Sequence, residues 1–505
     1  MDYSIFPPIY NFLASPLLIA IVATLHVIVA HFAIGGGFIF YLDERKSIKE
    51  GDRVKLEWLK PLSFKFLYIT LTFGAVSGVG IWFSISLLSP LATGYLITNF
   101  IWVWAMEWAF FILEVFAILL FVETWERVSS KLHLRINLIY FISAFLSLFF
   151  INAIITFQLT PSKVKGQLNL FKAFFNRTFF PSLFSRSLIT LIIASLFFLF
   201  FLSFKGEGDF KRVTSKRYFK FAFYSFLILI PALVLYGYQI PKENLENFTR
   251  ISYLSGLVYF SFLLLIFGII FSFFLSILFP SLNKPLYAIL PLLLVCASFG
   301  MMEWLREDLR LPYTVSGVIY GNDLRVKNYN NYQDEGILKK MPFIEKIKND
   351  EDLKGEMLFR KLCGGCHTLD SVNNLKKIFS RIDSEYSFSL VRKSSFMKAP
   401  MPPFPGKDEE ATLISNYIRR NIKIKKPYKD GESIFAVRCA PCHSFGGNYR
   451  DLKKSFKGVE KETIYEMIGS LDSLTESMPG WTGSEEERKN LSSYIYGEIN
   501  EGGKK

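Results

Sequence analysis

Two copies of one short cysteine and histidine pattern lie in the last third of the chain. Each copy reads C-x-x-C-H, and together they comprise Cys363, Cys366, His367, Cys439, Cys442 and His443. Two thiols three positions apart can form thioether bonds to the two vinyl groups of one porphyrin, and the adjacent histidine can then ligate the iron. A structural zinc site or a redox dithiol is the alternative for one such pattern. Because the pattern occurs twice, we predict two covalently bound haem c groups.

A methionine followed by proline lies at a similar distance beyond each pattern. Met401 lies 38 residues after Cys363, and Met478 lies 39 residues after Cys439. Thioether sulfur is a common second axial ligand of haem iron in cytochromes. We therefore expect Met401 and Met478 to be the distal ligands, with Met397 as the other candidate in the first copy.

The segments around the two patterns also repeat, and their first cysteines are 76 residues apart. A helical pattern leads into each motif, and an apolar-periodic helix that carries Tyr417 or Tyr494 closes each segment. This repetition predicts an internal duplication of a small helical domain. The expected domains are 351–425 and 426–505, preceded by a tether at 311–350.

The chain before the tether has the composition of a membrane protein. The whole chain is 51% hydrophobic and 17% aromatic, and a bilayer core of about 30 Å requires about 20 apolar residues for each helical span. Eight segments are suitable: 17–42, 64–88, 99–122, 136–157, 183–204, 219–238, 251–279 and 286–302. We therefore expect an all-α protein, with an eight-span transmembrane helical bundle over 1–310 followed by two tandem small helical domains.

The distribution of charge predicts the orientation of the bundle. The net charge is +14, but many Lys and Arg lie in short loops beside apolar segments, so no nucleic-acid partner is expected. The basic loops 43–60, 126–135 and 205–220 alternate with the uncharged loop 89–98, which places the basic loops in the cytoplasm. The basic loop 161–181 is an exception. Both termini and the C-x-x-C-H domains are expected on the periplasmic side of a bacterial inner membrane, where haem is attached covalently.

Ionisable side chains inside apolar spans are functional candidates, because burying a charge in the bilayer is costly unless it is paired or ligating. The candidates in and just beyond the spans are His26, His31, Glu107, Glu114, Arg186, Glu303, Glu307 and Arg310. A structural alternative for His26 and His31 is hydrogen bonding or packing inside the bundle. For Glu107 and Glu114 it is pairing with Arg or Ser on neighbouring helices. His133 lies in a basic loop, where solvation would suffice.

Residues 10–320, roughly, resemble subunit I of cytochrome bd oxidases. His26, followed nine residues later by Gly35, resembles the first-span histidine of that family, an axial ligand of its high-spin haem pair. Glu107 and Glu114 resemble the two essential glutamates of its third span.

The stretch from Glu307 through Arg310 to Tyr313 resembles the E-x-x-R-x-P-W stretch of the same family, whose glutamate ligates the other high-spin haem. The resemblance implies one or two high-spin haems of b or d type, held by His26 and Glu307. It also implies catalytic roles for Glu107, Glu114 and Arg310. The tail resembles class I cytochrome c domains, each with three to five helices around one haem.

Two departures from the bd pattern concern electron entry. The family holds a low-spin b haem with a histidine in the fifth span and a methionine in the seventh, and here Arg186 and Leu265 stand at those places. Neither side chain ligates iron, so this haem is expected to be absent. The quinol-binding loop between spans six and seven is also missing, since only about 239–250 is available.

These observations lead to two interpretations. In the first, the chain passes electrons between a periplasmic cytochrome c and a bd-like haem site that reduces oxygen, with Glu107 and Glu114 relaying protons. In the second, the bd-like part is a degenerate anchor, and the chain is a non-catalytic electron-transfer subunit of a larger respiratory complex. Nitric oxide is a third candidate, as the substrate of the haem site in place of oxygen, and a second membrane subunit or a larger respiratory complex is the expected partner.

Overall fold

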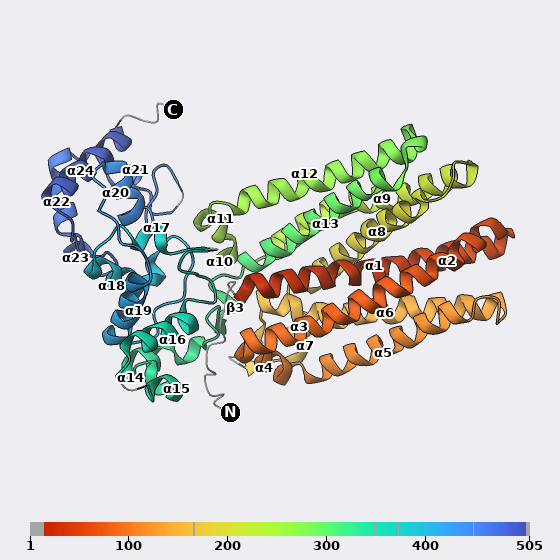
Figure 1. Ribbon diagram of the computed structural model, residues 1–505, viewed down its shortest axis with the longest axis horizontal. Coiled ribbons are helices and arrows are strands. Elements are labelled where there is room, and N and C mark those ends of the chain that lie inside the picture. Colours follow the sequence, from red (N-terminus) through yellow and green to blue (C-terminus); the bar gives the residue numbers. More distant parts are fainter. Residues whose placement is uncertain (1–14, 165–166, 348, 372, 448, 501–505) are drawn as a thin grey trace.

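The computed structural model shows an elongated molecule with long parallel helices at one end and a group of short helices at the other (Figure 1). The structure describes residues 15–164, 167–347, 349–371, 373–447 and 449–500. The fold is all-α, as expected, apart from two small hairpins. These pair β1 (Lys163–Val164) with β2 (Gln167–Leu168), and β3 (Tyr313–Val315) with β4 (Ile319–Tyr320). The two chain ends, expected on the periplasmic side, lie outside the described residues.

Among the described residues, eight helices are long and apolar enough to cross a membrane, which confirms the expected number of spans. The spans are Leu17–Glu50, Arg53–Leu88, Ile101–Glu123, Ser130–Leu159, Leu170–Ser203, Asp209–Gln239, Leu254–Leu278 and Pro285–Asp308. The helices of this part are α1 (Ser15–Glu50), α2 (Arg53–Ile69), α3 (Ala75–Leu88), α4 (Pro90–Asn99), α5 (Ile101–Glu123), α6 (Ser130–Leu159), α7 (Leu170–Phe174), α8 (Phe179–Ser203), α9 (Asp209–Gln239), α10 (Lys242–Leu245), α11 (Asn247–Arg250), α12 (Leu254–Phe273) and α13 (Pro285–Asp308).

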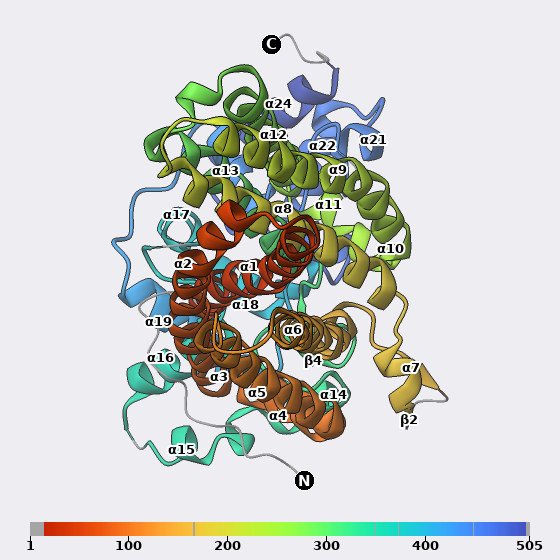
Figure 2. The same ribbon diagram turned by 90° about the vertical axis from the view of Figure 1, so that its right-hand side faces the viewer.

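Helix α1 lies at the centre of the bundle (Figure 2). It packs against α2, α3 and α6 on one side and against α8 and α13 on the other. Gly35 explains the close approach of α1 to α8, because a Cβ at this position would lie 2.1 Å from the Thr190 carbonyl oxygen. The residue that resembled a family motif therefore has a packing role in this fold.

The short helices form the C-terminal part of the molecule. They are α14 (Tyr329–Glu335), α15 (Pro342–Glu345), α16 (Glu351–Leu362), α17 (Lys376–Phe379), α18 (Ser384–Arg392), α19 (Asp408–Arg420), α20 (Gly431–Arg438), α21 (Leu452–Ser455), α22 (Lys461–Gly469), α23 (Leu471–Leu474) and α24 (Glu485–Asn500). We call residues 351–425 the first unit and residues 426–500 the second unit. Each unit has a hydrophobic core of its own.

Residues 311–350, expected as a tether, are packed rather than extended. Leu324, Tyr332, Ile337 and Met341 are buried in the same hydrophobic core as the helices of the first unit. The segment is polar in sequence, but several of its apolar residues enter this core and others enter a core of the bundle. The first unit is therefore joined to the bundle through a folded segment.

The two units repeat the same helix crossing. Helix α16 packs on α19 in the first unit, and α20 packs on α24 in the second. The rings of Phe359 and Tyr417 lie 5.6 Å apart at the first crossing, and those of Phe435 and Tyr494 lie 5.8 Å apart at the second. The repetition predicted from sequence is thus present in the packing of the helices.

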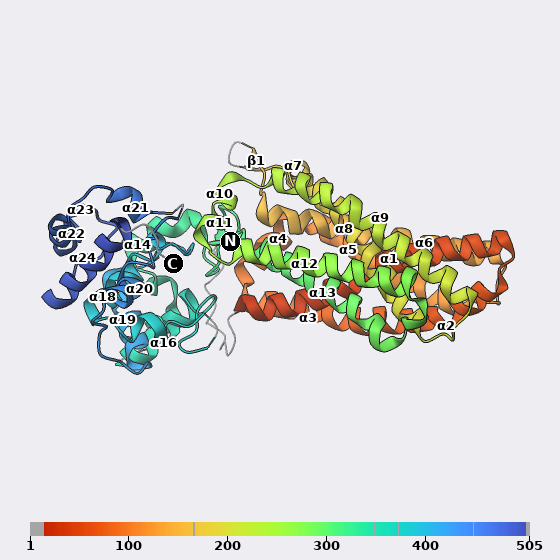
Figure 3. The same ribbon diagram turned by 90° about the horizontal axis from the view of Figure 1, so that it is seen from above.

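Hydrogen bonds fix the short helices to one end of the bundle (Figure 3). Asp323 accepts hydrogen bonds from the backbone N–H groups of Leu91 and Ala92 at the start of α4, each at 2.9 Å. Asn247 of α11 donates to the carbonyl of Asp308 at 3.1 Å and to that of Leu311 at 2.9 Å. These contacts tie the end of α13 and the segment that follows it to neighbouring spans.

Candidate functional site

The first C-x-x-C-H pattern forms a tight turn at the end of α16. The Cys366 and His367 amides donate to the Cys363 carbonyl at 3.0 and 2.9 Å. His367 Nδ1 donates to the Asn373 carbonyl at 3.2 Å, since a carbonyl can only accept. This bond fixes the ring orientation and makes Nε2 the nitrogen that would bind a metal.

The second pattern repeats this arrangement at the end of α20. The Cys442 and His443 amides donate to the Cys439 carbonyl at 2.9 and 2.8 Å. His443 Nδ1 donates to the Arg450 carbonyl at 3.3 Å. The two turns therefore present the same donor set in the same geometry.

The chemistry of these residues fits covalent haem. All five cysteines of the chain are free thiols, so both members of each pair can form thioethers. Burial lowers the pKa of His367 and of His443, which favours the neutral imidazole that ligates iron. Within the described ranges, no group of three His, Cys, Asp or Glu side chains gathers at metal-binding spacing, so nothing completes the ligand set that structural zinc requires.

The candidate distal methionines lie in extended loops. Met401 lies between α18 and α19, and Met478 lies between α23 and α24; both are half-buried. Met397, the other candidate in the first unit, packs against the hydrophobic core of that unit. The assignments of Met401 and Met478 therefore stay predictions.

A cavity of about 1410 Å³ connects the bundle to the first unit. Typical ligand pockets measure roughly 300–1,000 Å³, so this one is large enough for more than one drug-sized ligand. Its lining brings together the predicted site residues of the bundle and part of the first pattern, namely His26, Glu107, Glu114, Glu307, Arg310, Gly365 and Cys366. Sequence reasoning did not predict that Cys366 and His26 would share one cavity.

His26 lies against an irregular turn of the second span. Its Nδ1 lies 3.1 Å from the Gly74 carbonyl and 3.2 Å from Ser77 Oγ. Gly74 ends the π-helical turn Thr70–Gly74, and such turns are frequent at functional sites. The donation to Gly74 leaves Nε2 as the nitrogen through which a metal would be bound.

The two glutamates of α5 both line the cavity. Ser147 of α6 donates to Glu107 Oε1 at 3.1 Å, so the serine partner named as the structural alternative is present at this position. Glu114 lies two turns farther along the same face. The two carboxylates therefore follow one another along the cavity side of α5, with Glu114 nearer the C-terminal end of the helix.

Glu307 and Arg310 form an ion pair across the end of α13. The Arg310 side chain also donates to the Gln158 side chain and, at 2.8 Å, to the Thr314 carbonyl. Helix α13 ends at Asp308, so the ion pair joins the last turn of the helix to the segment that follows it. Arg310 is buried and fixes the orientation of the Glu307 carboxylate.

Arg186, which stands at the place of a family haem ligand, is itself part of an ion network. It contacts Glu303 at 2.6 Å, and Arg306 contacts the other oxygen of Glu303 at 3.0 Å. Leu265 is buried beside a void of about 10 Å³. Neither Arg186 nor Leu265 can ligate iron, so the two ligands that the family uses at these places are not available in this chain.

The expectation for His133 is wrong, because the residue is buried and not solvated. His133 Nδ1 lies 2.6 Å from Glu44 Oε1, and Asn137 donates to Glu44 Oε2 at 2.8 Å. The loop boundary misled the prediction, since α6 begins at Ser130 and brings His133 inside the bundle. His31 packs on the ring of Phe299 at 4.7 Å, in agreement with its structural alternative.

Comparisons with known proteins give two family matches. Residues 15–248 match the model of cytochrome bd terminal oxidase subunit I. Residues 426–495 match the model of cytochrome c oxidase, cbb3-type, subunit III. No curated protein sequence matches the chain.

One solved structure resembles most of the molecule. A bd oxidase chain from Geobacillus thermodenitrificans superposes with a TM-score of 0.51 and 15% identity, covering 69% of this chain and 98% of that chain. At this identity the likeness establishes the fold. The chain is a multi-pass membrane protein with a bd-like domain and a C-terminal cytochrome c domain, and both domains imply haem and respiratory electron transfer.

Proposed function

We propose that the chain exchanges electrons with a periplasmic cytochrome c and conducts them to a bd-like haem site at which oxygen is reduced. One observation carries the proposal: Cys366 of the first pattern and His26 and Glu307 of the bundle line one cavity. Electron transfer requires short distances between centres, and a cavity shared by the two sets of candidate ligands supports such a short distance.

The residues of the chain divide into three haem-binding groups. The first unit offers Cys363, Cys366 and His367, with Met401 as the distal ligand. The second unit offers its own two cysteines, His443 and Met478 in the same roles. In the bundle, His26 and Glu307 would hold one or two high-spin haems of b or d type. When bound, haem supplies one-electron exchange, and oxygen binding where the iron has an open position.

The remaining charged residues support this chemistry. Glu107 and Glu114 would carry protons along α5 to the cavity, since both line it. Arg310 would hold Glu307 in a fixed orientation through the ion pair across the end of α13. Low dielectric around such groups strengthens their electrostatic interactions.

Electron entry through the units takes the place of entry through quinol in this proposal. Arg186 and Leu265 offer no low-spin haem site, and only α10 and α11 occupy the connection between spans six and seven. Both units would lie in the periplasm with the chain termini. A second membrane subunit is supported by the span Arg53–Leu88, of which only 6% is buried inside this chain.

Haem analysis and oxygen uptake test the proposal together. Pyridine haemochrome analysis of the purified protein is expected to show haem c plus non-covalent haem. His26→Ala should lose non-covalent haem and oxygen consumption with reduced cytochrome c, while the haem c spectrum stays unchanged. His31→Leu, on the same helix, is the control and should retain both.

A second candidate function is a non-catalytic electron-transfer subunit that anchors a larger complex. The replacement of both family ligands, by Arg186 and Leu265, favours it, because one haem site of the bd pattern has lost its ligands. Detection of haem c alone, or unchanged oxygen consumption in His26→Ala, would support this function and contradict the first.

A further inference from the structure

The loop that carries Met478 in the second unit is bonded to side chains of the first unit. Lys393 Nζ donates to the Met478 carbonyl at 2.7 Å. Thr482 Oγ1 donates to Asp383 Oδ2 at 2.6 Å. Side chains of the first unit therefore hold the loop of the second unit at both Met478 and Thr482.

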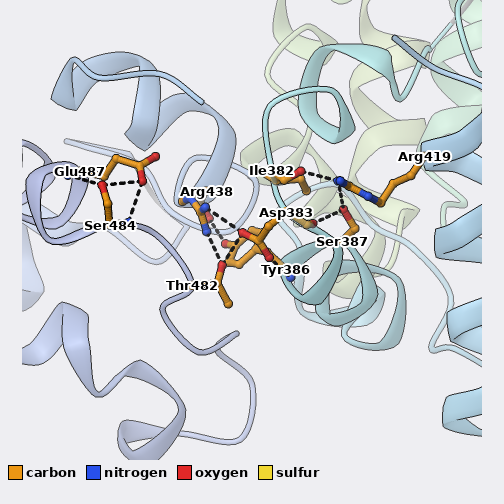
Figure 4. A network of polar contacts seen from close by, with 9 residues as sticks. All are labelled: Ile382, Asp383, Tyr386, Ser387, Arg419, Arg438, Thr482, Ser484 and Glu487. Atoms are coloured by element: carbon orange, nitrogen blue, oxygen red, sulfur yellow. Dashed lines mark hydrogen bonds and ion pairs between the residues drawn. The ribbon is translucent and has the colours of Figure 1, made fainter. Parts of the chain in front are cut away.

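Arg438 joins the same contact from the second unit (Figure 4). Its guanidinium donates to Asp383 Oδ2 at 3.0 Å and to Thr482 Oγ1 at 2.9 Å. The guanidinium also lies between two rings, 4.8 Å from that of Tyr386 and 5.0 Å from that of Trp481. Asp383, Arg438 and Thr482 thus form a closed triangle of polar contacts, which we call the inter-unit clamp.

The clamp adjoins the second C-x-x-C-H pattern. Arg438 directly precedes Cys439, and Tyr386 of the first unit donates to the Arg438 carbonyl at 2.5 Å. The Arg438 side chain is only 5% exposed. A buried guanidinium is costly unless it is paired, so the contact with Asp383 constrains how the two units dock.

Within the second unit, the Arg438 guanidinium holds the loop at Thr482, and weaker contacts hold it near Met478. Met478 N donates to the Thr475 carbonyl at 3.1 Å, and the hydroxyls of Thr475 and Ser477 lie 3.1 Å apart. These are neutral hydrogen bonds between near neighbours. The contacts from Lys393 and Asp383 involve charged groups, which make hydrogen bonds roughly twice as strong.

We propose that Asp383 and Lys393 of the first unit are positioning residues for iron ligation by Met478 in the second. The proposal rests on the proposed function, because it takes Met478 as the distal ligand. Docking of the first unit then holds the methionine loop closed over the second haem site. A second unit that is undocked would bind haem through its cysteines and His443 but would lose the methionine ligand.

The expected effect follows from the strength of one charge-assisted contact. Removing one such hydrogen bond should lower the ratio of methionine-bound to methionine-free second unit about tenfold, equivalent to about 1.4 kcal/mol. A methionine ligand raises the reduction potential of the haem. The midpoint potential of one c-type haem should therefore fall in the variants.

The test uses the full-length, haem-loaded protein and the near-infrared absorption band of methionine-ligated ferric haem. The absorption that is lost in Met478→Leu is the share of this band that belongs to the second unit. The midpoint potential that shifts in this variant is likewise that of the second haem. Asp383→Asn, Lys393→Gln and the milder Thr482→Val are each expected to lower the ratio of methionine-bound to methionine-free second unit about tenfold, measured as a loss from that share, with covalent haem content unchanged. Asp408→Asn is the matched control, because Asp408 pairs at 2.8 Å with Arg392 inside the first unit.

Two results would overturn the proposal, and they are distinguishable. If Met478→Leu leaves the band unchanged, Met478 is not the ligand and that part of the proposed function fails as well. If Met478→Leu removes its share of the band while the clamp variants keep it, the ligand is correct and the positioning role is wrong. Should Asp383→Asn fail to accumulate, Thr482→Val and Lys393→Gln decide the question.

Discussion

Replacing Gly431 by alanine is expected to destabilise the second unit. Gly431 begins α20 at its closest approach to α24, where a Cβ would lie 2.3 Å from the Asn490 carbonyl oxygen and 2.5 Å from Tyr494 Cβ. Ordinary contacts begin at 3.4 Å, so the two helices would have to separate by about 1 Å. Such overpacking costs about 1–3 kcal/mol, of which alanine's better helix propensity recovers about 0.5–1 kcal/mol.

A net loss of about 1–2 kcal/mol should be visible in the thermal unfolding of so small a unit. For domains of this size, each kcal/mol shifts the melting temperature by about 4–8 °C, so Gly431→Ala should lower it by roughly 5–15 °C. The assay is the loss of the native c-type haem absorption with temperature in the full-length protein. The duplicated position Gly355 should behave alike, since its Cβ would lie 2.4 Å from the Leu413 carbonyl oxygen.

Gly497→Ala on the same helix α24 is the matched control. Nothing lies within 4 Å of the Cβ that it would add, so its melting temperature should stay unchanged or rise. Equal melting temperatures for Gly431→Ala and the parent protein would refute the close crossing of α20 and α24. An equal fall in the melting temperature of Gly497→Ala would show that the destabilisation does not come from the close crossing of α20 and α24.

Three further predictions concern charged residues. Burial alone would raise the pKa of Asp383, but hydrogen bonds from its neighbours outweigh it and hold the pKa below its usual value. The stabilisation by Asp383 is therefore present at neutral pH and is lost as pH falls below about 4. An acid titration followed by the methionine–iron absorption band should therefore show no loss of the band above that pH. Glu303→Gln removes the carboxylate that pairs with the buried Arg186 and the half-buried Arg306, and should cost about 3–5 kcal/mol, whereas Arg186→Gln leaves the pair of Glu303 with Arg306 intact and should lower the melting temperature less. Glu114→Gln should reduce oxygen consumption at least about 100-fold, and Glu123→Gln, at the exposed end of the same helix, should not change it.

The spans and the duplication of the units could be predicted from sequence because both depend on local patterns. Apolar segments of sufficient length are visible without knowledge of their neighbours. The repeat of Cys363 at Cys439, with similar surroundings, likewise predicts two similar units. The helix crossings at Phe359 and Phe435 then follow from the same repeat in three dimensions.

Long-range packing explains what the sequence did not predict. Glu44 and His133 are 89 residues apart, and only the packing of α1 against α6 brings them together. The pairing of Arg186 with Glu303 likewise joins α8 to α13. The shared cavity of Cys366 and His26 depends on the docking of the first unit on the bundle, which no local pattern specifies.

The position of Cys366 also constrains the order in which the protein can be assembled. The thiol lines a cavity that is shared with the bundle, and the linkage of Asp323 to Leu91 and Ala92 secures the adjoining segment. If haem is joined to this thiol, as proposed, docking would bring bundle residues next to the point of attachment. We therefore expect haem attachment to precede the docking of the first unit on the bundle.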